Sequence, residues 1–219
     1  MLGELSVYDD LEPKPAALNM AVDEALLAEA RMPVLRFYRW RRPSMSFGYF
    51  GRYAEVADQF DRLDIVRRWT GGGIVPHGDD LTYSVIIPAA HPFFVRSSLE
   101  VYAAVHEAIC RALETNNIAA ILADQAAPKI SDDCFANAVR ADVLSGDRKI
   151  AGAAHRRSRA GLLHQGSIQR RDLPDRFRED FARILCDRFD RKTLEAATLE
   201  RAAEIALTKY ATAAWLTRR

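Results

Sequence analysis

The sequence lacks the features that would assign it at once to a membrane or secreted class. It contains no apolar run of the roughly 18 residues that a membrane-spanning helix requires. The N-terminal stretch MLGELSVYDDLEPKP has no positively charged segment ahead of an apolar block, so we expect no signal peptide. The three cysteines are few and widely spaced, which fits neither a disulfide framework nor a zinc-binding pattern. We therefore expect a cytoplasmic protein from a reducing compartment, with no membrane partner.

An excess of charge of either sign is also missing. The 31 Lys and Arg residues nearly balance the 30 Asp and Glu residues, which gives a formal net charge of +1 at pH 7. Nothing global therefore argues for nucleic acid as a partner. Hydrophobic residues make up 49% of the 219 residues and charged residues 28%, as in a globular protein with a full core. Because the chain has no internal repeat, linker or break in composition, we predict a single domain over residues 1–219.

The periodicity of apolar residues predicts an α+β fold. Residues 17–30 have the spacing of an amphipathic helix, and Ser97 with Glu100 forms a capping-box pattern before a second, long helix. A turn at 145–147 predicts a hairpin within 140–155. Further strands are predicted at 5–8, 34–40, 64–69, 81–88, 118–123 and 162–169, and everything after Arg171 is predicted to be helical. Strands in hairpins, with helices mostly at the ends, indicate mixed and antiparallel sheets flanked by helices.

Three consecutive glycines in RRWTGGGIVPHGDDLTYS, residues 67–84, form an unusual local pattern. The pattern is not a P-loop, because no Gly-Lys-Ser/Thr follows, and not a dinucleotide-binding turn, because Pro76 would interrupt the helix that such a turn opens. It predicts a strand, a bend at the glycines, a turn that holds His77, and a second strand. Two interpretations remain open: a bulge or tight corner of the sheet, or a bare backbone that a ligand approaches closely.

Lys149 lies in the predicted hairpin, shortly before a run of small residues that includes Gly152. Small side chains thin the wall of a binding site, so the lysine ammonium could hold a carbonyl or phosphate oxygen there. A solvated hairpin lysine is the alternative. His106, at the edge of the apolar stripe of the long helix, is expected to be a packed structural histidine rather than a ligand.

Of the three cysteines, only Cys134 is expected to be available for chemistry, because it lies in a polar loop beside Asp132 and Asp133. Cys110 and Cys186 fall within amphipathic helical patterns and are expected to be buried small hydrophobes. The two carboxylates next to Cys134 would disfavour a reactive thiolate unless a nearby cation offsets them. A lone loop cysteine can also be incidental.

Five segments, taken in chain order, resemble those of one superfamily, the lipoate and biotin protein ligases and the octanoyl transferases. They are LNMAVDEALL, LRFYRWRRPSMSFGYF, RRWTGGGIVPHGDDLTYS, GDRKIAGAA and LLHQGSI, and they run over most of the chain. Each segment alone is a weak signal, whereas five in the same order are specific. The resemblance implies a class II synthetase-like, biotin-ligase-like α+β catalytic domain. It also implies attachment of an octanoyl or lipoyl group, through an amide, to one lysine of a carrier domain.

The resemblance also implies roles for individual residues. By matching, Lys149 would be catalytic and would contact the activated carbonyl of the acyl group. The wall around the acyl chain and its activated head would be formed by Arg68, Gly71, Gly72, Gly73 and His77. Further substrate-binding positions would be Tyr83, Gly152 and His164, and no metal ligand is predicted among the site residues. Gly51 departs from the family pattern, which usually has a glutamine there.

In one branch of the family, a cysteine octanoyl transferase, Cys134 would be the catalytic nucleophile. It would accept octanoate as a thioester from an acyl-carrier protein and would need no cofactor. The pair Cys134-Phe135 stands at a matching spacing before Lys149. We favour this branch, in which the partners are an acyl-carrier protein as donor and a lipoyl carrier domain as acceptor, with no nucleic acid and no membrane.

Two other branches remain open. An ATP-dependent lipoate-protein ligase would first make a lipoyl-adenylate with ATP and Mg, and Gly73 resembles the ligases at that position. Asn137 stands where ligases have an Asn-Asp pair, but Ala138 replaces the Asp here. The last branch is a non-catalytic lipoyl-binding relative.

Overall fold

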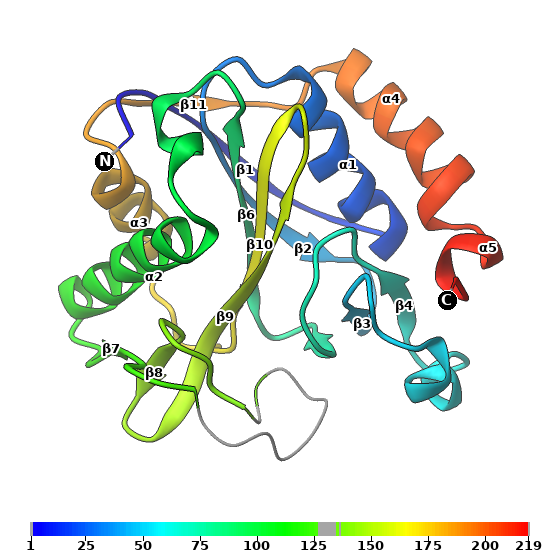
Figure 1. Cartoon of the computed structure of the whole chain (residues 1–219), viewed down its shortest axis with the longest axis horizontal. Helices are drawn as coiled ribbons and strands as arrows, with labels where there is room; N and C mark the ends of the chain where they lie inside the picture. Colours follow the sequence, from blue (N-terminus) through cyan, green and yellow to red (C-terminus); the bar gives the residue numbers. More distant parts are fainter. Residues whose placement is uncertain (1, 127–134, 136, 219) are drawn as a thin grey trace.

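The computed structural model describes residues 2–126, 135 and 137–218 (Figure 1). Within that part of the chain, an eight-stranded sheet has the order β11-β1-β2-β6-β10-β9-β8-β7, and a three-stranded sheet has the order β4-β3-β5. The strands are β1 (Leu5–Lys14), β2 (Val34–Trp40), β3 (Ser44–Phe47), β4 (Asp64–Arg67), β5 (Val75–His77), β6 (Leu81–Pro88), β7 (Ile121–Leu122), β8 (Val143–Ser145), β9 (Arg148–Arg157), β10 (Gly161–Ile168) and β11 (Phe189–Lys192). The helices are α1 (Ala16–Glu29), α2 (Ser98–Thr115), α3 (Phe177–Leu185), α4 (Ala196–Ile205), the π-helical turn η4 (Ala206–Tyr210) and α5 (Ala213–Leu216), with short 3₁₀ turns η1 (Tyr53–Glu55), η2 (Ala57–Gln59) and η3 (Pro92–Val95).

Both sheets are mixed. In the large sheet, β1 pairs in parallel with β2 and β11, whereas the pairs β2–β6, β6–β10, β10–β9, β9–β8 and β8–β7 are antiparallel. In the small sheet, β3 is parallel to β4 and antiparallel to β5. The α+β fold with mixed and antiparallel sheets flanked by helices is therefore confirmed.

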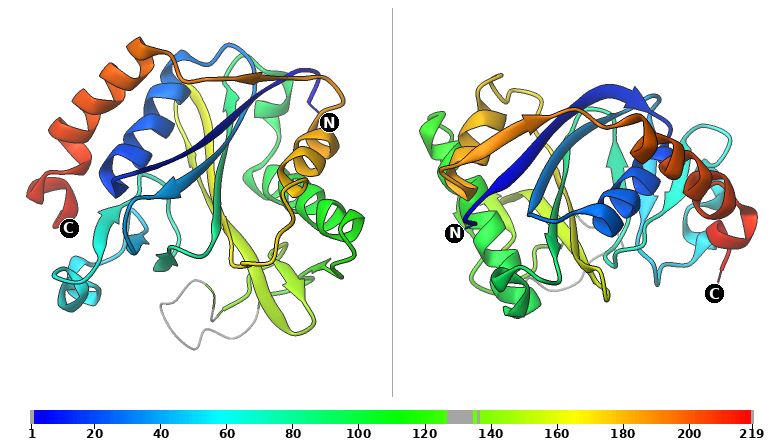
Figure 2. Two further views of the ribbon diagram at one scale, coloured as in Figure 1. Left: turned by 180° about the vertical axis from the view of Figure 1, so that it is seen from behind. Right: turned by 90° about the horizontal axis from the view of Figure 1, so that it is seen from above.

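Helices cover both faces of the large sheet (Figures 1 and 2). Helices α2 and α3 lie on one face, and α1 and α4 lie on the other. Successive side chains of a strand point to opposite faces, so Tyr83 and Val85 of β6 enter the core under α2 and α3, whereas Ile86 enters the core under α1 and α4. A residue of the central strands thus belongs to one face or the other, and this decides which side chains can line a site.

Helix α2 begins as its sequence predicted. Oγ of Ser97 accepts a hydrogen bond from the Glu100 N–H at 3.2 Å, and the Glu100 carboxylate accepts from the Ser97 N–H at 2.8 Å. This capping box satisfies two N–H groups that the helix start leaves without partners. The predicted hairpin is also confirmed, since β8 and β9 flank the turn at 146–147.

The prediction that only helices follow Arg171 is wrong, because β11 separates α3 from α4. It pairs in parallel with β1, with Leu5 opposite Phe189. A strand of this length at a sheet edge has too few alternations to be detected, and its partner lies at the other end of the chain. The strand predicted at 118–123 shrinks to β7, and the strand predicted at 5–8 extends to Lys14. No helix in the described part of the chain is long and apolar enough to cross a membrane.

Candidate active site

The glycine bend, residues 71–73 between β4 and β5, is wrapped around the guanidinium of Arg68. This group donates hydrogen bonds to the carbonyl oxygens of Gly71 and Gly73, both at 2.9 Å, and to Oγ of Ser46 at 2.7 Å. Arg68 is only 6% exposed, so its charge is held inside the bend rather than in solvent. The structure therefore brings together the arginine and the glycines that the sequence singled out.

Gly48 and Gly72 show why the backbone must be bare at this corner. Gly72 has a φ of +87°, and an added Cβ would lie 3.1 Å from Nη2 of Arg68 and 3.3 Å from Cβ of Ala154. A Cβ on Gly48 would lie 2.0 Å from the carbonyl oxygen of Gly72. At Gly71, by contrast, no atom lies within 4 Å of the Cβ position. The corner interpretation therefore accounts for Gly48 and Gly72 but not for Gly71.

His77 belongs to a chain of polar contacts that ends at the bend. Its Nδ1 lies 2.8 Å from Oδ2 of Asp80, and its Nε2 lies 2.7 Å from Oγ of Ser46. A carboxylate only accepts, so a neutral imidazole carries its proton on Nδ1 and accepts at Nε2 from the Ser46 hydroxyl. The Trp40 indole stacks on the imidazole with ring centroids 4.0 Å apart. The orientation of His77 is therefore fixed on three sides.

Asp80 anchors this series of polar contacts. Burial raises the pKa of its carboxyl, but attraction to His77 and a hydrogen bond from it, together with bonds from Ser167 and the Gly78 N–H, outweigh burial and lower the pKa below its usual value. Thr82 also donates to Oδ2 of Asp80, at 2.8 Å. Asp80 and Ser46 were not singled out from the sequence. Asp80 lies in the GDD turn after His77 and Ser46 in the MSFG segment, and neither segment has a distinctive sequence pattern.

A cavity lies between the glycine bend, β2 and the middle of β9 and β10. Its empty volume is about 390 Å³ with the open mouth included. Of the predicted site residues, it is lined by Arg68, Gly72, His77 and Gly152. Residues that sequence reasoning missed complete the lining: Met20, Tyr38, Trp40, Ser46, Val75, Thr82, Ala153, Ala154, Gln165, Gly166 and Ser167. A mainly apolar hollow with polar groups at its wall suits a hydrocarbon chain that ends in a polar head.

Lys149 is buried and not a solvated hairpin lysine. Its Nζ lies 2.8 Å from Oδ2 of Asp142, and the two side chains are 4% and 0% exposed. The lysine side chain lies directly over Gly152, where an added Cβ would be 2.6 Å from Cε and 2.9 Å from Nζ. Nζ also lies 5.2 Å from the ring centroid of Phe135 and donates to the Asn137 carbonyl oxygen at 3.3 Å. Gly152, which lines the cavity, therefore makes room for the lysine side chain beside that cavity.

Tyr83 and His164 lie elsewhere, on the face of the sheet covered by α2. The Tyr83 hydroxyl is 3.0 Å from Nε2 of His164, and Nδ1 of His164 is 2.6 Å from Nε2 of His155. Neither Tyr83 nor His164 lines the cavity. A Cβ on Gly166 would lie 2.3 Å from the Tyr83 ring, so this glycine makes room for the tyrosine.

His106 is packed, as predicted, and completes a cluster of three imidazoles with His155 and His164. Its Nδ1 lies 2.6 Å from the Ala141 carbonyl oxygen, and its Nε2 has no hydrogen-bond partner. Burial is the largest cause that lowers the pKa of His106 to about 4 and of His155 to about 3. Burial also lowers the pKa of His164 well below its ordinary value. The three rings are therefore neutral near pH 7.

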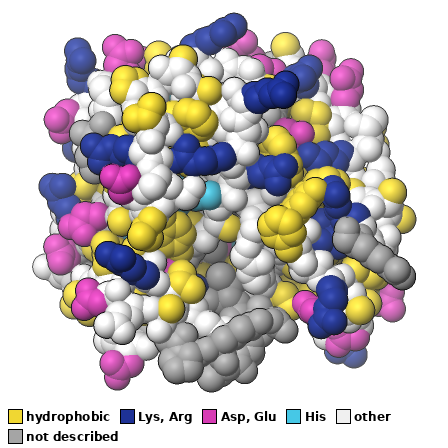
Figure 3. Space-filling model, in the orientation of Figure 1, with side chains coloured by type: hydrophobic (Ala, Val, Ile, Leu, Met, Phe, Trp, Pro, Cys, Tyr) yellow, Lys and Arg dark blue, Asp and Glu magenta, His cyan; other side chains and the backbone are white. Residues whose placement is uncertain are grey.

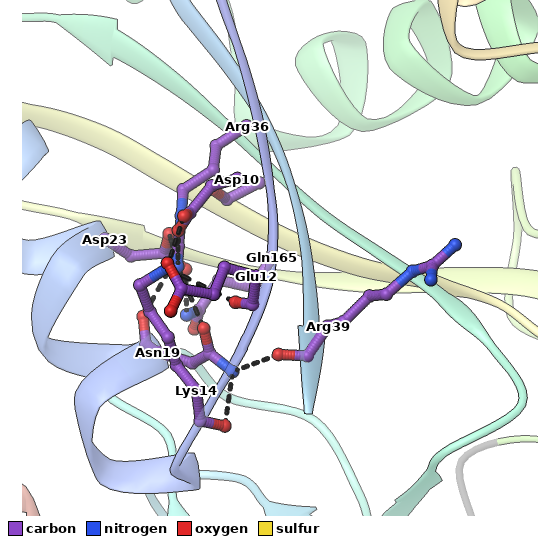
Figure 4. Close-up of polar contacts among 9 residues, drawn as sticks. Asp10, Glu12, Lys14, Asn19, Asp23, Arg36, Arg39 and Gln165 are labelled. Carbon is purple, nitrogen blue, oxygen red and sulfur yellow. Dashed lines mark hydrogen bonds and ion pairs between the residues drawn. The ribbon is translucent and has the colours of Figure 1, made fainter. Parts of the chain in front are cut away.

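A buried ionic network lies beside the cavity, between α1, β1 and β2 (Figure 4). The fully buried Arg36 guanidinium lies 2.7 Å from Oδ2 of Asp10 and 2.7 Å from Oδ1 of Asp23. Gln165, which lines the cavity, donates to Oδ2 of Asp23 at 2.7 Å and accepts from the hydroxyl of Thr70 at 2.8 Å. Thr70 precedes the glycine bend, so the network ties the bend to α1. An Arg in the apolar strand LRFYRW and an Asp in the apolar stripe NMAVDEALL were the signals that could have revealed it.

Two of the three cysteines are buried, as predicted. Burial, with Glu107 and Glu114, raises the pKa of the Cys110 thiol to about 12. Cys186 packs its sulfur against the Leu2 carbonyl oxygen at 2.9 Å. Cys134, the predicted nucleophile, lies outside the described residues. Within the described residues, no group of three or more His, Cys, Asp or Glu side chains could hold a metal ion.

Comparison with known protein families connects this geometry to a known class. Residues 15–202 match the model of the lipoyl protein ligase A/B catalytic domain. The chain belongs to this family. The octanoyltransferase LipM of Oceanobacillus iheyensis is 37% identical over 165 residues, which cover 71% of this chain and 60% of that protein. The octanoyltransferase LipM of Carboxydothermus hydrogenoformans is 37% identical over 161 residues, which cover 69% of this chain and 60% of that protein. This chain thus spans about 60% of the length of these curated relatives.

Solved structures of the family share the fold. A lipoate-protein ligase A bound with ATP superposes with a TM-score of 0.76 at 21% identity, over 99% of both chains. A bi-partite lipoate protein ligase from Thermoplasma acidophilum, studied with its E2 lipoyl domain, gives a TM-score of 0.69 at 21% identity, over 99% of this chain and 96% of that one. The fold implied by the sequence resemblance is therefore confirmed.

Proposed function

We propose that this chain is an octanoyltransferase that moves an octanoyl group from an acyl-carrier protein to a lysine of a lipoyl carrier domain. The observation that carries the proposal is the buried Lys149, whose side chain lies over Gly152, a residue that lines the apolar cavity. Its Nζ contacts the ring of Phe135, the residue that follows Cys134 in the chain. The relatives named octanoyltransferase, at 37% identity, support the same activity.

In the first step, the Cys134 thiolate attacks the carbonyl carbon of the donor thioester. A carbon–sulfur bond to Cys134 forms while the bond to the donor sulfur breaks, and the donor leaves as a thiol after taking up a proton. The Lys149 ammonium favours the thiolate before the attack and stabilises the oxyanion that develops during it. Arg68 and Gly72, at the glycine bend, also line the cavity.

In the second step, the neutral amine of the acceptor lysine attacks the Cys134 thioester. A carbon–nitrogen bond forms, the Cys134 sulfur leaves, and the amine proton passes to that sulfur or to water. This chemistry needs no cofactor, because the thioester is already an activated acyl group. The acceptor is a lipoyl carrier domain, and the cytoplasm keeps the thiol reduced.

The ATP-dependent ligase is the alternative, and the likeness to a structure of a lipoate-protein ligase A bound with ATP favours testing it. That enzyme class would use ATP and Mg to form a lipoyl-adenylate in the same cavity, with Lys149 again at the carbonyl. A non-catalytic lipoyl-binding relative would fill the cavity without turnover.

The test is a mass spectrum of the intact protein after incubation with octanoyl-acyl-carrier protein in the absence of ATP. We expect one octanoyl adduct, which Cys134→Ser abolishes and which Cys110→Ser and Cys186→Ser retain. Addition of a lipoyl carrier domain should then move the octanoyl group to that domain. Modification of the carrier domain that requires ATP and survives Cys134→Ser would establish the ligase instead. Binding of lipoate without any transfer would establish the non-catalytic relative.

A further inference from the structure

A closed ring beside the glycine bend alternates three cations with three aromatic side chains. We term it the cation–aromatic ring, and its members in order are Arg156, Trp69, Lys209, Trp215, Arg218 and Tyr49. Each cation lies 4.4 to 5.1 Å from the centroids of its two aromatic neighbours. On the face shown in Figure 3, Lys and Arg side chains form a band with hydrophobic side chains among them.

Positive charge in this ring exceeds negative charge. Lys209 pairs with Glu24 at 2.6 Å, and the same carboxylate accepts from the Tyr210 hydroxyl. Among the residues that the structure describes, no hydrogen bond or ion pair joins the side chain of Arg156 or Arg218 to a protein acceptor, and Nε of Arg156 is buried without a partner. Within the described part of the chain, Glu24 is therefore the one carboxylate paired with a cation of the ring, and the surplus positive charge calls for an anion from outside the chain.

The ring is built to present hydrogen-bond donors. Aromatic rings contact a guanidinium through its flat faces and leave the N–H groups at its edge available for a planar or tetrahedral anion. Lys209, Trp215 and Arg218 also line a surface hollow of about 560 Å³ with its open mouth included. We propose that the cation–aromatic ring binds a phosphate group of the acyl donor.

The position of the ring along β9 decides which phosphate it takes, given that Lys149 contacts the acyl carbonyl as in the proposed function. Lys149 lies over Gly152, and Arg156 is four residues farther along the strand, or about 13 Å. In an acyl-adenylate a single oxygen joins the phosphorus to the carbonyl carbon, so that phosphate would lie beside Lys149. It would lie about 13 Å short of the backbone position of Arg156.

A phosphopantetheine arm has the length that this spacing needs. About thirteen covalent bonds separate its phosphorus from the sulfur that bears the acyl group, which is roughly the reach of four extended residues, or about 15 Å. The ring therefore fits the phosphodiester at the base of the arm of an acyl-carrier protein, with the thioester end at Lys149.

The binding test compares 4′-phosphopantetheine with pantetheine, which lacks the phosphate, by tryptophan fluorescence. Trp69 and Trp215 are two of the three tryptophans in the chain, so the signal reports on the ring. We expect phosphopantetheine to bind at least about tenfold more tightly than pantetheine, the effect of one charge-assisted hydrogen bond. Arg156→Gln and the exposed Arg218→Gln should each remove most of this difference. The matched control is Arg159→Gln, which changes an exposed arginine in the turn between β9 and β10 and should keep the difference in affinity.

Equal affinity for the two compounds, or a loss in Arg159→Gln as large as in Arg156→Gln, would overturn the proposal. AMP that binds as tightly as phosphopantetheine and depends on Arg156 would also overturn it, in favour of a nucleotide phosphate. Melting curves of each variant show that the fold is retained. Because the titration needs no turnover, its outcome is independent of whether the chain transfers octanoate.

The kinetic test uses two octanoyl donors, the carrier protein and a short thioester without phosphate. Arg156→Gln should raise KM for the carrier at least about tenfold. The ratio of kcat/KM for the carrier to kcat/KM for the short thioester should therefore fall toward one. An unchanged preference in a folded Arg156→Gln protein contradicts the proposal even when the proposed transfer activity itself is present.

Discussion

Nζ of Lys149 and Oδ2 of Asp142 form a buried ion pair 2.8 Å apart. Removal of one partner from such a pair leaves an uncompensated buried charge and costs about 3–5 kcal/mol, whereas replacing both partners is often neutral. The structure therefore gives Lys149 a folding role in addition to its proposed chemical role. Variants of both partners can separate the two.

The first prediction separates these roles of Lys149. Lys149→Ala should lower the free energy of unfolding by about 3 kcal/mol and slow octanoyl transfer at least about 100-fold. The double variant Lys149→Met with Asp142→Asn should recover most of the stability but none of the activity. Urea unfolding and single-turnover transfer rates measure the two effects. Recovery of transfer together with stability in the double variant would leave Lys149 with a structural role only.

The second prediction concerns the glycine bend. Gly72→Ala forces a side chain into a left-handed backbone and crowds Arg68, so we expect a loss of roughly 1–2 kcal/mol in unfolding free energy. Gly71→Ala, a matched control with open space at its Cβ position, should leave stability within about 0.5 kcal/mol.

Octanoate affinity of the same two variants tests the ligand interpretation of the bend. Weaker binding in the stable Gly71→Ala protein would mean that the acyl group lies against the backbone there. Unchanged binding in Gly71→Ala, with stability and affinity lost in proportion in Gly72→Ala, would mean that the glycines serve only the tight corner of the backbone.

The third prediction concerns Asp80, the anchor of His77. Asp80→Asn replaces an ionised acceptor of several hydrogen bonds by a neutral amide, so unfolding free energy should fall by about 1–3 kcal/mol. Asp79→Asn is the matched control: among the described residues Asp79 pairs only with Arg171, in an exposed ion pair, so this substitution should cost less than about 1 kcal/mol. Chemical denaturation at pH 7 compares them, and similar losses in both variants would argue against the anchoring role.

The Asp80 contribution also has a pH signature. Its folded pKa is lowered, so its stabilisation is present above the pKa of the unfolded chain near 4 and is lost as the pH falls below it. The difference in stability between wild type and Asp80→Asn should therefore shrink as the pH falls below about 4.

The fourth prediction concerns the imidazole cluster. His106, His155 and His164 have lowered pKa values when folded, whereas unfolded histidines titrate near 6.5. Below about pH 6.5 the unfolded chain binds protons that the folded chain does not, so stability should fall as the pH is lowered, down to about the folded pKa values of 4 and 3. Each histidine contributes at most about 1.4 kcal/mol per pH unit, and less for the partly exposed His155.

The measurement is unfolding free energy from pH 8 to pH 5. His106→Asn should reduce the slope of unfolding free energy against pH in the acid range by the amount that one proton contributes, about 1.4 kcal/mol per pH unit. A slope that is the same in wild type and in this variant would mean that His106 takes up a proton in the folded state.

The sequence by itself determined most of the secondary structure and the family. The periodicity at residues 17–30 and 81–88, the capping box at Ser97 and the turn at 145–147 are local patterns, because backbone propensity and hydrogen bonding within a few residues decide them. The order of five motifs assigned the superfamily, which the family match confirms. The sequence also identified Arg68, Gly72, His77 and Gly152, which line one cavity.

Tertiary structure alone decided what surrounds these residues. Strand β11 exists because β1 lies beside it, and no local pattern in FDRK records that partner. Tyr83 and Gly152 both belong to predicted motifs, yet pleating sends the Tyr83 side chain to the face under α2 while Gly152 lines the cavity on the other side.

The burial of Lys149 is the clearest case of this division. A lysine in a hairpin is most often solvated, and nothing in GDRKIAGAA states that Asp142 will lie 2.8 Å away. Asp142 and Lys149 belong to one hairpin, but the pair is buried because α2 packs on it, with the Tyr102 hydroxyl donating to Oδ1 of Asp142. Local sequence therefore determines which groups are present. The long-range packing of the sheet and helices determines which of them form ion pairs, line one cavity or share a hydrogen bond.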